Sequence, residues 1–441
     1  MEQDTEILVI GAGPAGLAAA AELDARHHQV LLVEARERVG GRILTVRHPA
    51  SPVPLDLGAE FVHGLPAVAP RTWRVAIESE LPILDVPDRH HLAREGSLVD
   101  NPDFWDRVGR TIRKAGSTCT GSRARDLSFA EALARSGSTP AERATARAFV
   151  EGFHAADPDK LSMRALLRET RDSDAGQGDR AFRLLDGNIQ LAHSLIARSV
   201  KVRCLHASPV TEIRWEPGSV EVLIEGDGTR RIRARAALVT VPVGPLLNIR
   251  FDPPLPPEKS EAAEGVLSGA AIKVLIGFKE PFWERRGAFD LGFVHSEERD
   301  FPTWWSALPF RTRFLTGWTG GPGAEALAGL GREELEDRAL RSLSRIFRMK
   351  ASSLAALTEI FLHHDWIRDP YSQGAYSYLA VGAVEAPSRL AAPVARTLYF
   401  AGEATTPGGI AGTVEGAIES GVRAASALIA AETPSSRRRT A

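Results

Sequence analysis

Three glycines and one glutamate near the start of the chain have the spacing that binds a dinucleotide. Gly11, Gly13 and Gly16 form a G-x-G-x-x-G motif directly after the apolar run 7–10. Glu34 ends a second apolar run, after an alanine-rich stretch typical of a helix. The glycines allow a tight turn and a close approach of the backbone to a pyrophosphate, and the helix N-terminus offers amides to the phosphates. Glu34 can bind both ribose hydroxyls and disfavours a 2′-phosphate, so NADP is not expected.

A single lysine, Lys273, interrupts the apolar run 266–283. The alternate residues around it are apolar and predict a strand with one face in a core: Ile272, Val274, Ile276 and Phe278. Taken alone, Lys273 is expected in solvent, because lysine is rarely buried without a partner. The alternative is a cation aimed into a cleft, where it stabilises developing negative charge or relays a proton.

The composition excludes several classes of protein. The chain has 441 residues, enough for two domains or one interleaved pair, and a net charge of −2 that gives no attraction to nucleic acid or anionic membranes. Two cysteines indicate a reducing compartment and no disulfide framework or metal site. Because neither a signal-peptide pattern nor a long apolar run is present, we expect a cytoplasmic protein without a membrane anchor.

The residues after Glu34 decide which dinucleotide is expected. Arg36 is followed by an R-x-G-G-R run that begins at Arg38, contains Gly41 and ends at Arg42. With this run the chain resembles the flavin-containing amine oxidases, the superfamily of monoamine oxidases, polyamine oxidases and histone demethylases. The resemblance implies FAD as the cofactor, with Arg42 beside its pyrophosphate and flavin.

Further segments carry the same resemblance. Residues 55–64 resemble the segment that passes beside the isoalloxazine ring, residues 209–213 the segment that contacts adenine, and residues 366–383 and 398–425 the flavin-facing part of the C-terminal half. The resemblance places these further residues at the cofactor: Ala15, Ala35, Arg36, Leu57, Gly58, Ala59, Glu60, Val210, Trp366, Gly402, Glu403, Gly412, Thr413 and Val414.

The order of these segments implies an α/β protein with a discontinuous architecture. A Rossmann-like FAD-binding domain is expected from residues 1–78, 185–265 and 386–432. A substrate domain with a mixed sheet and helices is expected from residues 79–184 and 266–385, and residues 433–441 are expected to be a disordered tail.

The resemblance also assigns the substrate side. Tyr376 matches one aromatic wall beside the flavin, and Thr413 stands where monoamine oxidases have a tyrosine, so the half-open cage favours the polyamine oxidase branch. His63 could accept a proton or tune substrate charge, and a structural histidine is the alternative. Glu60 could attract the second ammonium of a diamine. Ala375 stands where monoamine oxidases attach FAD through cysteine, which implies a non-covalent cofactor.

We therefore expect an FAD-dependent amine oxidase. A hydride would pass from the α-carbon of the amine to flavin N5, the imine would hydrolyse, and O2 would reoxidise the flavin to give H2O2. Lys273 matches the family lysine that holds a water against N5. The alternatives are an L-amino-acid oxidase, a related oxidase or desaturase, and a non-catalytic FAD-binding protein. The first needs a cation for the substrate carboxylate, often an arginine in residues 57–64, and none is present there. The oligomeric state is left open.

Overall fold

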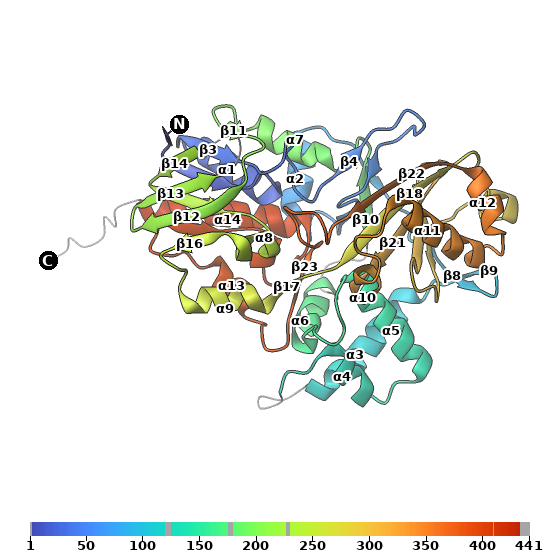
Figure 1. The fold of residues 1–441 in the computed structure, drawn as a ribbon. Coiled ribbons are helices and arrows are strands. Elements are labelled where there is room, and N and C mark those ends of the chain that lie inside the picture. The colour runs from blue at the N-terminus through green and yellow to red at the C-terminus, as the bar shows by residue number, and fades with distance from the viewer. Residues whose placement is uncertain (1, 120–124, 175–179, 226–229, 409, 433–441) are drawn as a thin grey trace.

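The computed structural model describes residues 2–119, 125–174, 180–225, 230–408 and 410–432 (Figure 1). A five-stranded parallel sheet lies at its centre, in the order β11-β3-β2-β15-β24. Its strands are β2 (Ile7–Ile10), β3 (Val30–Val33), β11 (Arg203–Leu205), β15 (Ala236–Val239) and β24 (Leu398–Phe400). Four of them are buried on both faces, as the unbroken apolar runs require of a covered parallel sheet.

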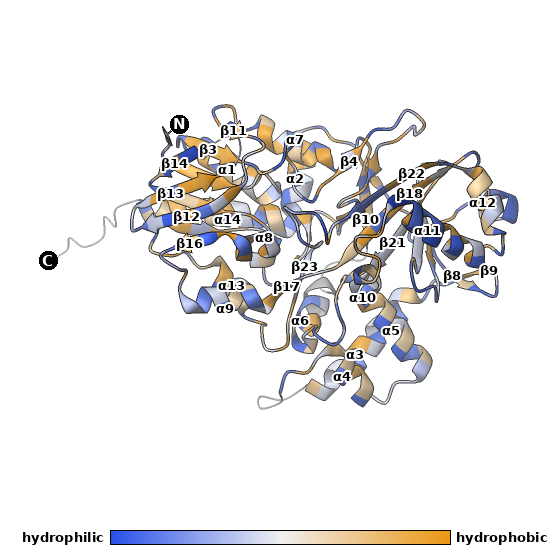
Figure 2. Ribbon diagram, in the orientation of Figure 1, coloured by the Kyte–Doolittle hydropathy of each residue, from blue (hydrophilic) through white to orange (hydrophobic). Residues whose placement is uncertain are grey.

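Helices and a second sheet cover the two faces of the parallel sheet. One face packs against α1 (Pro14–Asp24), α7 (Ile189–Ala197) and the long helix α14 (Val414–Glu432). The two helices α1 and α14 touch closely, since a Cβ on Gly421 would lie 2.1 Å from the carbonyl oxygen of Ala15. The apolar colour in Figure 2 is concentrated in these central strands.

The second sheet lies on the opposite face and has the order β1-β14-β13-β12-β16. Its strands are β1 (Glu2–Asp4), β12 (Val210–Glu216), β13 (Ser219–Ile224), β14 (Arg230–Ala234) and β16 (Arg250–Asp252). The short helices α8 (Val243–Asn248), α9 (Pro257–Gly265) and α13 (Ala386–Ala391) pack beside it.

A seven-stranded mixed sheet forms the other half of the molecule, in the order β22-β18-β21-β20-β19-β8-β9. Its strands are β8 (His90–Arg94), β9 (Ser97–Asp100), β18 (Ala271–Phe278), β19 (Phe293–His295), β20 (Thr303–Ser306), β21 (Phe314–Gly320) and β22 (Thr358–Asp365). Only the β19–β8 pair is parallel among its described ladders. Helices α11 (Arg332–Ile346) and α12 (Ala351–Leu357) flank this sheet, and α11 is strongly polar in Figure 2.

Four helices form a group of their own at the bottom of Figure 1, and one of them, α5, packs against β21. They are α3 (Phe104–Gly116), α4 (Phe129–Arg135), α5 (Pro140–Phe153) and α6 (Met163–Asp174), and they share one apolar cluster. Two of them begin at capping boxes, in which Ser128 pairs with Glu131 and Thr139 pairs with Glu142.

Short elements connect the two halves. The strand β10 (Ala181–Leu184) pairs with β6 (Val62–His63) and β7 (Ile83–Asp85). Strand β4 (Thr45–Val46) pairs with β5 (Leu55–Asp56), and β17 (Val266–Ser268) pairs with β23 (Ser377–Leu379). Helix α2 (Pro70–Glu78) lies beside α14.

The expected α/β fold is confirmed, with a Rossmann-like sheet and a separate mixed sheet. The strands of the parallel sheet come from residues 1–78, 185–265 and 386–432, and those of the mixed sheet from residues 79–184 and 266–385. We propose these two groups of segments as the cofactor domain and the substrate domain. The expected tail, residues 433–441, lies outside the described residues. Among the described helices, none is long and apolar enough to cross a membrane.

Candidate functional site

The glycine motif forms a tight turn between β2 and α1. A Cβ on Gly16 would lie 1.9 Å from the carbonyl oxygen of Gly11, so only glycine allows the helix to start this close to the turn. Gly11 has φ +105°, and a Cβ there would lie 2.8 Å from Thr240 Oγ1. Gly13 is the N-cap of α1, and a Cβ on it would meet nothing within 4 Å. The turn therefore leaves open space in front of the helix N-terminus, as a dinucleotide pyrophosphate requires.

The carboxylate of Glu34 is fixed by backbone amides at the end of β3. It accepts hydrogen bonds from Ala12 N at 2.7 Å and from Arg36 N at 2.8 Å. The carbonyl oxygen of Glu34 accepts the amide of Ser208 at 2.9 Å, which brings the start of β12 at Val210 to the same place. A carboxylate has about four acceptor sites, so this held Glu34 keeps capacity for ribose hydroxyls.

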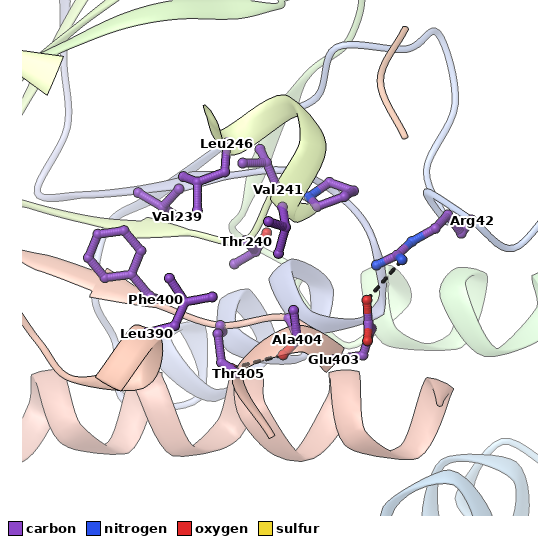
Figure 3. A pocket seen from close by; sticks show the side chains of 14 residues that line it. Arg42, Val239, Thr240, Val241, Leu246, Leu390, Phe400, Glu403, Ala404 and Thr405 are labelled. Atoms are coloured by element: carbon purple, nitrogen blue, oxygen red, sulfur yellow. Dashed lines mark hydrogen bonds and ion pairs between the residues drawn. The ribbon is translucent and has the colours of Figure 1, made fainter. Parts of the chain in front are cut away.

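A pocket opens at the carboxyl ends of β15 and β24 (Figure 3). This edge of a parallel sheet is where ligands of doubly wound folds bind. Its walls come from residues 239–243 and 400–405, and Arg42 and Glu403 face each other across one side. The glycine turn and the held acid fit a dinucleotide cofactor, and the pocket marks the neighbouring part of the same sheet edge.

Arg42 ties the expected pyrophosphate region to the C-terminal segments. Its Nη1 donates to Glu403 Oε1 at 2.9 Å and to the carbonyl oxygen of Ala375. The other carboxylate oxygen of Glu403 accepts from Ser377 Oγ at 2.7 Å. Gly58 passes directly under this arginine, because a Cβ on Gly58 would lie 2.1 Å from the carbonyl oxygen of Arg42.

Arg36 holds a second link between distant segments. Its guanidinium donates two hydrogen bonds to Asp369, at 3.0 and 2.7 Å, and one to Ser372 Oγ at 2.8 Å. Burial opposes ionisation of Asp369, but the hydrogen bonds from His364 and Arg36 hold the pKa of that carboxyl below its usual value. The side chain of Arg36 thus fastens residues 364–372 to the cofactor segment.

Lys273 is buried, with a relative exposure of 2 %. The solvent position that the strand pattern alone predicted is wrong, because all eight residues of β18 are buried and both faces of the strand are covered. Its ammonium donates to the carboxylate of Glu60 and to the carbonyl oxygen of Gly58 at 3.3 Å. Nζ also lies 5.5 Å from the ring centroid of Trp305. Two of the residues expected beside the flavin ring, Gly58 and Glu60, therefore hold Lys273 directly.

Glu60 is the centre of a buried ionic cluster. Its Oε2 accepts from Lys273, and its Oε1 accepts from Arg183 and from Trp305 Nε1 at 3.0 Å. Burial opposes its charge, but Arg183 and Lys273 overcome this and lower the pKa of Glu60 to about 2. The carboxylate that was expected to attract a second substrate ammonium is engaged by these three side chains.

Arg183 was missed by the sequence reasoning. It lies on β10, donates Nε to the carbonyl oxygen of Leu308 at 2.9 Å and Nη2 to that of Ser306 at 3.3 Å, and stands 4.6 Å over the ring of Phe61. The available signal was the same as for Lys273, a lone cation within an apolar run, here AFRLL at residues 181–185.

Asp56 lies beside this cluster and accepts a hydrogen bond from Thr45 Oγ1. Burial raises the pKa of Asp56 to about 6, although the hydrogen bond from Thr45 favours the ionised form and opposes this increase. The negative charge of Glu60 also raises it. Asp56 is therefore the carboxyl of this region that titrates closest to neutral pH among those with a resolved shift.

Tyr376 lies between the two halves, next to the start of α14. Its hydroxyl donates to the carbonyl oxygen of Phe153. A Cβ on Gly412 would lie 3.5 Å from Tyr376 Cβ, so the glycine turn packs against the tyrosine. Thr413 is beside it and serves as a helix cap: its Oγ1 accepts the amide of Gly416 at 3.0 Å and donates to Ile410 O at 2.6 Å.

His63 is exposed and stands among aromatic rings. Its ring centroid lies 6.0 Å from that of Phe61 and 6.1 Å from that of Phe153. Phe61 also contacts Phe293 and Trp305 at 5.9 and 6.1 Å. Tyr376 and His63 thus both contact Phe153, Tyr376 at its carbonyl oxygen and His63 at its ring.

The remaining expected residues hold the cofactor segments together. Trp366 is buried beside Ala375 and donates Nε1 to the carbonyl oxygen of Leu57 at 3.1 Å. The carbonyl oxygen of Ala59 accepts from Asn188 at 3.0 Å. Gly402 has φ +128° and donates its amide to Ser420 at 2.8 Å. The other expected positions lie along the same elements: Ala15 in α1, Ala35 after β3, Gly41 before Arg42 and Val414 at the first position of α14.

The sequence comparisons identify a family. The model for flavin containing amine oxidoreductase matches residues 14–429. The chain is 27% identical over 455 residues to an amine oxidase [flavin-containing] of Oncorhynchus mykiss, covering 95% of this chain and 85% of the relative. It is 29% identical over 450 residues to polyamine oxidase 3 of Oryza sativa, covering 95% and 88%. It is 28% identical to lysine-specific histone demethylase 1 homolog 3 of Arabidopsis thaliana, of which it spans 30%.

Solved structures show the same fold. Wild-type putrescine oxidase bound to putrescine aligns with a TM-score of 0.79 at 22% identity, covering 98% of this chain and 100% of that one. Cyclohexylamine oxidase from Brevibacterium oxydans aligns with a TM-score of 0.81 at 23% identity, covering 97% and 99%.

Proposed function

Because the chain belongs to the family of flavin-containing amine oxidoreductases and is FAD-dependent, we propose that it oxidises an amine with O2 as the acceptor. The amine loses a hydride from its α-carbon and a proton, and the imine adds water to give a carbonyl compound and ammonia or a smaller amine. When bound, FAD accepts the hydride at N5 and returns the electrons to O2, which forms H2O2.

The buried ammonium of Lys273 is the observation that carries this proposal. It is held by Gly58 and Glu60, in the segment that the family resemblance places beside the flavin ring. A cation at this position favours the negative charge that develops as O2 accepts electrons. A protein that kept FAD only as a structural element would gain nothing from this cation, since a buried charge is costly to hold.

The other residues bind and orient the cofactor in this proposal. The turn at Gly11, Gly13 and Gly16 accepts the pyrophosphate, and Glu34 binds the ribose. Arg42, paired with Glu403 at the side of the pocket, would bind the pyrophosphate. The N-terminus of α14, at Thr413, would stabilise negative charge on the reduced flavin through its partial positive charge.

Tyr376 supplies an aromatic wall for the substrate, and the exposed His63 lies nearby through Phe153. The amine must be neutral to give a hydride, and removal from water favours that form over the ammonium. For a diamine, Glu60 does not offer an unpaired carboxylate to the second ammonium, because it is already ion-paired with Lys273.

An L-amino-acid oxidase is the main rival, and it needs a cation for the substrate carboxylate. Arg183 and Lys273 are cations in the right region, but both bind the carboxylate of Glu60. Both cations are therefore already paired with a carboxylate, which disfavours the binding of a substrate carboxylate at either of them.

A peroxide-release screen tests the function. Purified holoprotein is assayed for H2O2 with aromatic monoamines, cycloalkylamines, diamines, polyamines and L-amino acids, with O2 uptake measured in parallel. We expect peroxide with at least one amine class, equal in amount to the O2 consumed, and none with amino acids. Flavin that no amine reduces anaerobically would contradict the proposal, whereas reduction without O2 uptake would contradict only the choice of acceptor.

We also propose a reducing, cytoplasmic setting. Cys119 and Cys204 are both free thiols, one buried and one half-buried. Measurement of two free thiols in protein from its native cells supports this location, and a disulfide would contradict it.

A further inference from the structure

The ammonium of Lys273 is oriented by its hydrogen-bond acceptors. An ammonium has three N–H groups. Within the described residues, hydrogen bonds to Glu60 and Gly58 account for two of them. The third N–H is then available for the water that the proposed function places at flavin N5. The direction of this third N–H is set by where Glu60 and Gly58 stand.

Glu60 is itself fixed from the opposite side. Arg183 and Trp305 both donate to its Oε1, which leaves Oε2 for Lys273. Arg183 is held in turn by the carbonyl oxygens of Leu308 and Ser306. The arrangement runs from β10 through the loop before β6 to β18, so it connects segments that the sequence separates widely.

The cluster holds two cations around one carboxylate. Lys273 and Arg183 contribute two positive charges against the one negative charge of Glu60, and the second negative charge beside them, on Asp56, is present only above about pH 6. Without Glu60, the two cations would repel each other in a buried site, where such repulsion is only weakly screened. The carboxylate thus allows the two cations to stay in place and keeps one of them directed toward the cofactor.

We propose that Glu60 is the positioning residue of Lys273, and that Arg183 and Trp305 hold Glu60 for this role. The inference rests on the proposed function of Lys273 in the reaction with O2. It differs from the expected role of Glu60 as an anchor for substrate, because here Glu60 acts through the lysine and touches neither amine nor O2.

The test is a double-mutant cycle with Glu60→Gln and Lys273→Met. Glu60→Gln keeps the size of the side chain but turns an N–H₂ group toward one of the two cations. We expect it to slow reoxidation of reduced flavin about tenfold, less than the roughly hundredfold loss expected for Lys273→Met. In the Lys273→Met background, Glu60→Gln should change reoxidation by less than twofold, since residues that act as a unit are not additive.

Two readouts independent of turnover accompany the cycle. The urea midpoint of the apoprotein should show coupling between the two substitutions, because the ion pair exists without cofactor. The flavin reduction potential should become more positive in Glu60→Gln, which removes a negative charge, and more negative in Lys273→Met, which removes a positive one. Glu284→Gln is the matched control: Glu284 is also buried and ion-paired, with Arg311, and its substitution should leave both half-reactions unchanged.

The outcomes separate the two proposals. Unchanged reoxidation in Lys273→Met, with apoprotein coupling intact, would overturn the role of Lys273 and the inference with it. If reoxidation is slow in Lys273→Met but has the wild-type rate in Glu60→Gln, only the positioning role is overturned. Fully additive effects would also overturn it, because Glu60 would then act independently of Lys273. If Glu60→Gln does not fold, Glu60→Asp and Arg183→Lys, which keep the charges and shift the geometry, are measured against the same expectation.

Discussion

Lys273 donates a hydrogen bond to Glu60 inside the protein, across 213 positions of sequence. This one contact joins the fully buried strand β18 to the loop that the family resemblance places beside the flavin. It explains how a lysine can occupy the interior, because burying an unpaired ammonium would cost more free energy than the packing of its side chain contributes.

The cofactor is expected to be bound without a covalent link. Ala375 has no nucleophile and is buried beside Trp366, so no thioether can form at this position. Purified protein should be yellow, and precipitation with acid should release all of its flavin as free FAD into the supernatant. Flavin that remains with the washed pellet would show an attachment elsewhere.

Tyr376 should matter for its ring more than for its hydroxyl. Tyr376→Ala removes the aromatic wall and is expected to lower kcat/KM for the best amine at least tenfold while FAD stays bound. Tyr376→Phe loses only the hydrogen bond to Phe153, and should keep most activity while the free energy of unfolding falls by about 1 kcal/mol. Equal and severe losses of activity in both variants would mean that the hydroxyl takes part in the reaction.

Asp56 should make stability depend on pH. Its pKa is raised by burial to about 6 from the ordinary value of 3.8, so the folded state favours the protonated form. This contribution is present in full below pH 4 and is lost as the pH rises through 6. Asp56→Asn cannot ionise and should therefore be more stable than wild type at pH 8, by on the order of 2 kcal/mol, with a much smaller difference at pH 4. Urea unfolding of the apoprotein at both pH values measures this, and a constant difference would contradict it.

Glu415, in the first turn of α14, should stabilise a different helix. Its carboxylate accepts the amides of Arg71 and Thr72, at 3.1 and 2.7 Å, and so caps α2, which has no side-chain cap of its own. Glu415→Gln should lower the free energy of unfolding by about 1–2 kcal/mol. Glu419→Gln is the control on the same helix, because its pair with Arg71 is partly exposed and should contribute under 1 kcal/mol. Equal effects would refute the cap.

Local patterns in the sequence were enough to predict the cofactor-binding half of the fold. The apolar runs that became β2 and β3, the glycine turn and Glu34 are all set within 35 residues, where turn geometry and burial leave few alternatives. The α/β fold and the cofactor followed from these elements and from the family resemblance.

The ionic cluster could not be predicted in the same way. The alternation of apolar residues along β18 correctly indicated a strand, but it suggested that one face is exposed to solvent. In the structure the segment around Glu60 covers that face. Lys273, Glu60 and Arg183 lie on elements that meet only in the folded chain, and a lone charge in an apolar run does not reveal its partner. The expected roles of Glu60 and Thr413 as substrate-facing residues stay predictions, although one is now seen in an ion pair and the other as a helix cap.

The most direct test of the account is stopped-flow reoxidation of reduced Lys273→Met over a range of O2 concentrations. Lys259→Met is the matched control, because Lys259 is also buried, but its ammonium donates to backbone carbonyl oxygens such as that of Leu390 at 2.7 Å. If one preorganised charge contributes about 3 kcal/mol to the reaction with O2, Lys273→Met should be reoxidised roughly a hundredfold more slowly than wild type, and Lys259→Met at the wild-type rate. An unchanged rate in Lys273→Met with a full complement of FAD would contradict the account, and would leave Lys273 as a structural partner of Glu60.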